Sequence, residues 1–134
     1  MIWFWQWKPK IEREISGYKL KAEIVAKYPD IDIILRDRIY EIPADPWDVI
    51  WKMTPNDFIY VKEKRDCEDA VRISRGWLSK KGYGNLVAAD CRIEKPGEAH
   101  ALIGFWYKGE ILLGEPQWGK IVEKPGWRVD RLIL

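Results

Sequence analysis

The sequence has few of the residues from which metal sites and imidazole chemistry are built. Its 134 residues include two cysteines and one histidine. A structural zinc site needs four nitrogen or sulfur ligands and a catalytic site needs three, so this set does not favour a metal centre. No cofactor is expected either, because no glycine-rich phosphate loop is present; KKGYG, with Gly82 and Gly84, is better explained as a helix stop. Any imidazole chemistry depends on His100 alone.

The sequence also lacks a charge excess and a long apolar segment. Its 23 basic and 21 acidic residues leave a net charge of +2, and their interspersed signs do not favour a nucleic-acid partner. No apolar run approaches the roughly 18 residues that a membrane span needs. The segment MIWFWQWKPK lacks the basic leader and the cleavage site of a signal peptide. We therefore expect a cytoplasmic protein with reduced thiols and no membrane span.

Length and composition predict a single domain over residues 1–134, since 134 residues, of which 47% are hydrophobic, are enough to bury a core. Residues 1–10 form a Trp-rich arm in which Trp3, Trp5 and Trp7 alternate with other residues. We interpret the arm as an edge strand or a segment packed on the body. The alternative is that its indoles dock a partner or a membrane surface, since amphipathic aromatics favour wet interfaces.

The first part of the body carries mixed signals. Residues 11–28 fit both helical spacing and strand alternation, and a helix is favoured although Gly17 weakens it. Residues 31–42 are rich in β-branched side chains and end at Pro43, which predicts an extended segment or a strand.

Three helix starts follow, each marked by a capping residue. Asp45 with Pro46 predicts the first and Thr54 with Pro55 the second. Asp66 begins the third. That helix carries an apolar stripe expected to face a core, formed by Ala70, Val71, Ser74, Trp77 and Leu78.

After Gly84 the pattern changes to strands. The segments NLVAADCRI, AHALIGFWY, EILLGE and GWRVDRLIL favour strands, and Lys108-Gly109 is a two-residue hairpin signal. Helices followed by an antiparallel sheet predict an α+β architecture.

Cys67 lies among acidic residues, which should raise its pKa. If Asp66 caps the helix, however, Cys67 sits at its start, where free N–H groups and the helix dipole stabilise a thiolate. Glu68 and Asp69 need not share its face, because adjacent helical residues do not face each other. Cys91, in mid-strand among apolar residues, is interpreted as a core residue.

His100 is the candidate base for this thiolate. A two-residue turn pairs Tyr107 with Glu110, and the continued register places His100 opposite Gln117 and diagonal to Glu115. Diagonal neighbours on a sheet are within reach of long side chains. Glu115 is therefore expected to orient the imidazole, with Gln117 as the alternative.

Four tryptophans outside the arm are predicted to lie in a core. Trp47, Trp51, Trp77 and Trp106 all fall on predicted core faces. Trp106 also shares strand parity with His100, which leaves open that it walls a cleft.

The run WKMTPNDFIYVKEKRDCEDAV resembles the transglutaminase-like cysteine peptidases of bacteria and their phages. GEAHALIGF is similar to that family's His-Ala strand and ILLGEP to the strand of its third residue. The resemblance, over about residues 47–118, implies a papain-like fold with the Cys helix packed on an antiparallel sheet. It implies Cys67 as nucleophile, His100 as base and Glu115 as orienter.

The expected function is a thiol hydrolase that acts on peptide or amide bonds of a peptide or protein substrate. The oxyanion would be held by the backbone N–H of Cys67 and a donor near Tyr60. Two alternatives stay open. One is a catalytically degenerate family member that serves as a binding or assembly module, and the other is a cell-wall endopeptidase.

Overall fold

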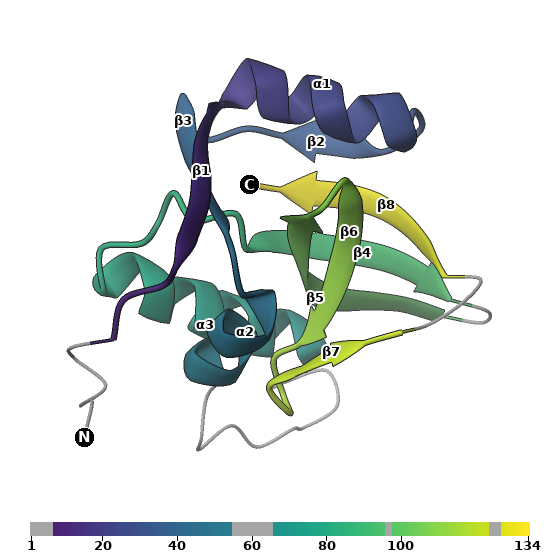
Figure 1. Cartoon of the computed structure of the whole chain (residues 1–134). Coiled ribbons are helices and arrows are strands. Elements are labelled where there is room, and N and C mark those ends of the chain that lie inside the picture. Colours follow the sequence, from purple (N-terminus) through teal and green to yellow (C-terminus); the bar gives the residue numbers. More distant parts are fainter. Residues whose placement is uncertain (1–6, 55–65, 96–97, 124–126) are drawn as a thin grey trace.

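Over the part of the chain that the structure describes, the protein is mostly sheet, with three short helices of 11, 8 and 14 residues (Figure 1). The computed structural model describes residues 7–54, 66–95, 98–123 and 127–134. In chain order the elements are β1 (Ile11–Ser16), α1 (Gly17–Lys27), β2 (Asp32–Ile34), β3 (Ile39–Pro43), α2 (Pro46–Met53), α3 (Cys67–Lys80), β4 (Ala89–Lys95), β5 (Glu98–Tyr107), β6 (Glu110–Glu115), β7 (Lys120–Val122) and β8 (Arg128–Ile133).

The main sheet has six strands in the order β2-β8-β4-β5-β6-β7. Its neighbours are antiparallel except for β2 and β8, which run parallel. β1 and β3 form a separate antiparallel pair. The fold is therefore built on a mixed sheet with its short parallel strand at one edge.

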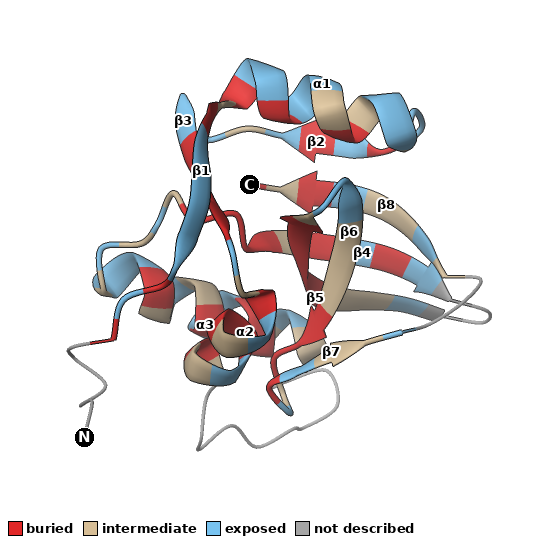
Figure 2. Cartoon of the chain, viewed as in Figure 1, coloured by how far each residue is buried: buried red, intermediate tan, exposed pale blue. Residues whose placement is uncertain are grey.

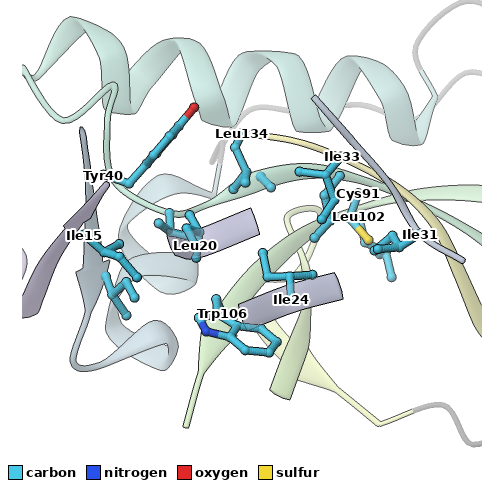
Figure 3. Packing of buried hydrophobic residues seen from close by; sticks show 14 of the residues in the cluster. Ile15, Leu20, Ile24, Ile31, Ile33, Tyr40, Cys91, Leu102, Trp106 and Leu134 are labelled. Carbon is cyan, nitrogen blue, oxygen red and sulfur yellow. The ribbon is translucent and has the colours of Figure 1, made fainter. Parts of the chain in front are cut away.

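Strand alternation divides the interior into two cores, one on each face of the sheet. On β5, Leu102 and Trp106 join the core under α1, whereas Ile103 and Phe105 join the core under α2 and α3. Figure 2 shows that buried residues concentrate on β4 and β5. Figure 3 shows Leu20 and Ile24 of α1 in the first core, near Trp106.

The predicted papain-like, transglutaminase-like fold, with helices ahead of an antiparallel sheet, is wrong. The body begins with β1, strands and helices alternate through the first half, and the main sheet is mixed. The physical reason lies partly in residues 11–28, which divide into a strand and a helix at Ser16. The Ser16 hydroxyl accepts the Lys19 N–H at 3.3 Å and so caps α1.

Gly17 begins α1 instead of weakening it. A Cβ atom at this position would lie 3.1 Å from the backbone oxygen of Asp37, so glycine allows the chain to approach closely here. Residues 31–42, predicted to be extended or a strand, contain β2 and most of β3, with a turn between the two strands. Between them the Tyr40 hydroxyl accepts the backbone N–H groups of Arg36 and Asp37, which holds the turn.

Several local predictions are confirmed. Asp45 caps α2, with Pro46 at its start, and the β5–β6 register pairs Tyr107 with Glu110. Thr54, predicted as a helix N-cap, instead ends α2, and its hydroxyl donates to the backbone oxygen of Ile50 at 2.6 Å. The rest of that predicted second helix lies outside the described residues.

Two tryptophans of α2 do not lie in the core. Trp47 is 49% exposed and Trp51 is 65% exposed. The helix buries Pro46, Val49, Ile50 and Met53 instead, so its apolar stripe is rotated away from the two indoles.

The predicted arm is described at its last indole only, since Trp3 and Trp5 lie outside the described residues. Trp7 is buried, its Nε1–H donates to Asp48 Oδ2 at 2.9 Å, and its ring lies 5.6 Å from that of Trp77. At this point the arm packs on the body. Within the described ranges no helix is both long and apolar enough to traverse a bilayer.

Candidate functional site

The acids around Cys67 are occupied by the start of α3. Asp66 Oδ1 accepts the Glu68 N–H and Asp69 Oδ2 accepts the Asp66 N–H, both at 3.1 Å, which forms a capping box. Arg72, one turn further on, lies 3.6 Å from Glu68 and 3.5 Å from Asp69. Cys67 is the first residue of α3. The carboxylates therefore stabilise the helix terminus from which the thiol projects.

The Cys67 sulfur meets the end of β5. The backbone N–H of Ala101 donates to Sγ at 3.4 Å. A hydrogen bond with the His100 side chain lowers the pKa of Cys67, and the Ala101 N–H lowers it further. Partial burial and the charge of Asp66 act in the opposite direction and do not overcome these contacts. These contacts thus stabilise the thiolate form of this sulfur relative to an ordinary cysteine.

His100 links the thiol to a carboxylate. Its Nε2 lies 3.0 Å from Glu115 Oε2, which leaves Nδ1 as the ring nitrogen available to Cys67. Hydrogen bonds to Cys67 and Glu115 raise the pKa of His100 to about 9. A raised imidazole pKa beside a lowered thiol pKa shifts the balance of the pair toward a proton on His100 and a thiolate on Cys67.

Glu115 is held from its other oxygen by the turn that follows β6. It is 4% exposed, and its Oε1 accepts the backbone N–H of Gln117 at 3.2 Å. The Glu115 backbone oxygen accepts the N–H groups of Trp118 and Gly119. Gln117, predicted as an alternative orienter, thus contributes its backbone amide to the carboxylate. In the sequence, this contact could have been anticipated from the turn that directly follows the strand ending at Glu115.

A cavity of about 350 Å³ opens beside the thiol. It lies between the first turns of α3 and the strands β4, β5 and β8, and both Cys67 and His100 line it. Arg92 and Arg131 also line it, and sequence reasoning missed both. The sequence does indicate the position of Arg92. Because it lies between the apolar residues Cys91 and Ile93 on β4, its side chain must point to the opposite face of the sheet from theirs.

Of the remaining predicted residues, Trp106 takes no part in this geometry. Trp106 is buried in the core under α1, with its ring 6.4 Å from that of Tyr28, and does not line the cavity, so the proposed cleft wall is wrong. Tyr60 lies outside the described residues. Among the described residues, no three His, Cys, Asp or Glu side chains are grouped to hold a metal ion.

The comparisons with known proteins identify structural neighbours. A PSL1a–E64 complex matches with a TM-score of 0.74 and 20% identity, over 90% of this chain and 50% of the other. The Polyporus squamosus lectin bound to the epitope Neu5Aca2-6Galb1-4GlcNAc matches with a TM-score of 0.71 and 18% identity, over 90% and 49%. The chain thus spans about half of each neighbour and shares its fold there. No family model and no curated protein matches.

These findings overturn the family resemblance and the function expected from it. The structures that share the fold are those of a lectin, not of a transglutaminase-like cysteine peptidase. The prediction that the protein hydrolyses peptide or amide bonds of a peptide or protein substrate is therefore wrong. The two alternatives, a degenerate member of that family and a cell-wall endopeptidase, are wrong for the same reason. The physical reason is that RDCEDAV encodes a capped helix start, which fits many folds.

Proposed function

We propose that Cys67, His100 and Glu115 form a nucleophilic thiol site that bonds covalently to an electrophilic carbon of a bound ligand. One observation carries this proposal: a cysteine at a helix start has a lowered pKa and shares a hydrogen bond with an imidazole whose pKa is raised to about 9. Such a pair is a reactive nucleophile at neutral pH. The role of Glu115 is to orient the ring and stabilise its charge.

The covalent step follows from these positions. The sulfur lone pair forms an S–C bond to the electrophilic carbon, and the bond from that carbon to its leaving atom breaks. The leaving atom takes the electron pair and accepts the proton of the His100 imidazolium. Glu115 keeps the imidazole aimed at the sulfur through the 3.0 Å contact to Nε2.

E64 supplies a direct test, because its epoxide is opened by thiolates and one structural neighbour, PSL1a, forms a complex with it. We expect one equivalent to add to the protein at pH 7, with the adduct on Cys67. The Cys91→Ala variant should react equally, and Cys67→Ala should not react. Mass spectrometry of the intact protein and of its peptides measures this. Equal labelling of both cysteines, or none, contradicts the proposal.

A second candidate is glycan binding through exposed indoles. Trp47, Trp51 and Trp118 are 49%, 65% and 65% exposed. Trp51 also lies against the turn after β6, since a Cβ at Gly119 would be 3.1 Å from its ring. Exposed aromatic surface of this kind marks binding sites, and one neighbour is a lectin bound to a sialylated trisaccharide.

Calorimetric titration with that trisaccharide tests the second candidate. Trp51→Ala and Trp118→Ala should abolish the heat of binding. Tyr18→Ala is the matched control, because Tyr18 is an exposed aromatic residue, 88% accessible, on α1. No heat with the parent protein, or equal loss in the control, excludes glycan binding at these indoles.

Location and partners complete the proposal. A cytoplasmic location suits a thiol that must stay reduced. The near-neutral charge balance supports a small ligand or glycan over nucleic acid.

A further inference from the structure

We propose that the cavity beside Cys67 selects an electrophile that carries a carboxylate, which Arg92 binds. This inference rests on the proposed nucleophilic thiol and adds the chemical class of its ligand. It is carried by the placement of one arginine next to the thiol and by the charges around that arginine.

Arg92 lies one strand away from the residue that contacts the sulfur. It is directly opposite Ala101 in the β4–β5 register, and Ala101 donates its N–H to Cys67 Sγ. Directly opposite Cα atoms are roughly 4.5–5.5 Å apart, and opposed side chains share a face of the sheet. The Arg92 guanidinium thus enters the cavity on the side of the thiol.

Among the described residues, each charged side chain that lines the cavity has a partner of opposite charge, apart from Arg92. Arg131 is directly opposite Arg92 on β8, and its Nε donates to Asp32 Oδ2 at 3.1 Å. Arg72 pairs with two carboxylates of the first turn of α3. Asp90 lies 3.8 Å from Arg36 and 3.7 Å from Arg75.

Arg92 itself has no ion-pair or hydrogen-bond partner within the described ranges. Its direct neighbour across the strands is a second arginine, and like charges in that position are unfavourable. A bound anion would remove this repulsion. The guanidinium fork of arginine matches a carboxylate in geometry and charge.

The size of the cavity limits the ligand to a small molecule. At about 350 Å³ the cavity lies at the small end of ligand pockets. A carboxylate on Arg92 would place the carbon that bonds to sulfur only a few atoms away.

Two matched pairs of reagents test the inference. Iodoacetate and iodoacetamide both transfer a CH2 carbon to sulfur with loss of iodide. They differ only in that iodoacetate carries a carboxylate where iodoacetamide carries an amide. 3-Maleimidopropionate and N-propylmaleimide repeat the comparison with the carboxylate further from the reacting carbon. The rate constant for Cys67 is measured with each reagent at pH 7, and the anionic-to-neutral ratio is taken within each pair.

The expected result is a fall of this ratio by roughly three- to fivefold in Arg92→Gln for at least one pair, with the neutral reagents unaffected. Arg92→Lys should recover part of the ratio. Arg128→Gln is the charge-matched control, because Arg128 pairs with Glu94 and Asp130 and does not line the cavity. This control should leave the ratio unchanged.

The outcomes separate the two proposals. A fast neutral reagent with a ratio that Arg92→Gln does not change overturns the carboxylate site and leaves the nucleophilic thiol intact. A ratio that falls equally in Arg128→Gln also overturns it, because net charge alone would then explain the effect. A parent protein whose Cys67 reacts with none of the reagents overturns both. If Arg92→Gln does not fold, as judged by circular dichroism, Arg92→Lys carries the test through a smaller fall in the ratio.

Discussion

Cys67 and Cys91 lie close to the same cavity and yet differ in burial and in the direction of their pKa shifts. Cys67 lies at the start of α3, half-buried, where a hydrogen bond with His100 lowers its pKa. Cys91 lies within β4, 2% exposed, where burial raises its pKa to about 12. The surroundings of Cys67 favour a thiolate, whereas those of Cys91 favour the neutral thiol of a small apolar side chain.

The comparison teaches that neighbours in space, and not neighbours in sequence, decide the reactivity of a thiol. Cys67 is flanked by Asp66 and Glu68, which by charge alone would disfavour a thiolate. Asp66 caps the helix and the Glu68 carboxylate pairs with Arg72, and the sulfur instead meets an N–H group and an imidazole from β5.

The largest effect on the difference between the two cysteines is expected when the imidazole of His100 is removed. In His100→Gln the pKa of Cys67 should rise toward its ordinary value of 9.0, since the first cause of its lowering is lost. The parent should reach its plateau of iodoacetamide reactivity below pH 9, and the variant only above it. At pH 6.5 the rate should fall by about tenfold or more. Superimposable pH–rate profiles would contradict the pair.

A smaller effect is expected from the carboxylate that holds the imidazole. Glu115→Gln should slow alkylation of Cys67 at pH 7 by about threefold to tenfold, because it removes one of the two contacts that raise the pKa of His100. Gln117→Ala is the control, since Gln117 supplies its backbone N–H and that group is retained. A larger effect of Gln117→Ala than of Glu115→Gln would show that the carboxylate is not the orienter.

Cys91 should contribute more than Cys67 to the free energy of unfolding, which is the reverse of their order in reactivity. Cys91→Ala removes a buried sulfur packed close to Gly104 and Leu132, and should lower the free energy of unfolding by about 1 kcal/mol. Cys67→Ala should cost less, because Cys67 is only half-buried. Urea denaturation of the two variants measures the difference. A greater loss with Cys67→Ala would mean that its contacts are mainly structural.

The smallest effect is expected at Asp66, whose side chain both caps α3 and, through its charge, raises the pKa of Cys67. Asp66→Ser keeps a capping oxygen and removes the charge that raises the pKa of Cys67. Reactivity at pH 6 should therefore increase, by less than about threefold. Asp66→Ala removes the cap as well and should lower the free energy of unfolding by about 1 kcal/mol, which thermal denaturation would show. Slower alkylation in Asp66→Ser would contradict this division of roles.

Local signals in the sequence predicted local structure well. Asp66 marked the start of α3 because a capping residue acts within one turn. The two-residue turn at Lys108-Gly109 fixed the register that places His100 and Glu115 at the same end of one hairpin. Sequence reasoning could therefore name all three residues of the thiol site, whose chemical role stays a prediction.

What sequence reasoning missed depends on contacts between distant segments. The parallel pairing of β2 with β8 joins residues that are 99 positions apart, such as Asp32 and Arg131, and no turn signals it. The same holds for the row of Arg92 and Arg131, which exists only because β8 returns beside β4. Periodicity alone also could not decide that α2 turns Trp47 and Trp51 outward, because its stripe of Val49, Ile50 and Met53 is equally apolar. That residues 1–134 form one domain stays a prediction.

The hairpin of β5 and β6 also has a consequence for the order in which the site forms during folding. His100 and Glu115 are only 15 residues apart, and hairpins of this kind form within about 1–10 μs. Cys67 is 34 residues from Ala101 and must be brought in with α3, which carries a larger loop-closure cost. The imidazole and carboxylate should thus meet early, whereas the sulfur acquires its reactivity only when the helix docks. Thiol reactivity during refolding would then report the last step of assembly.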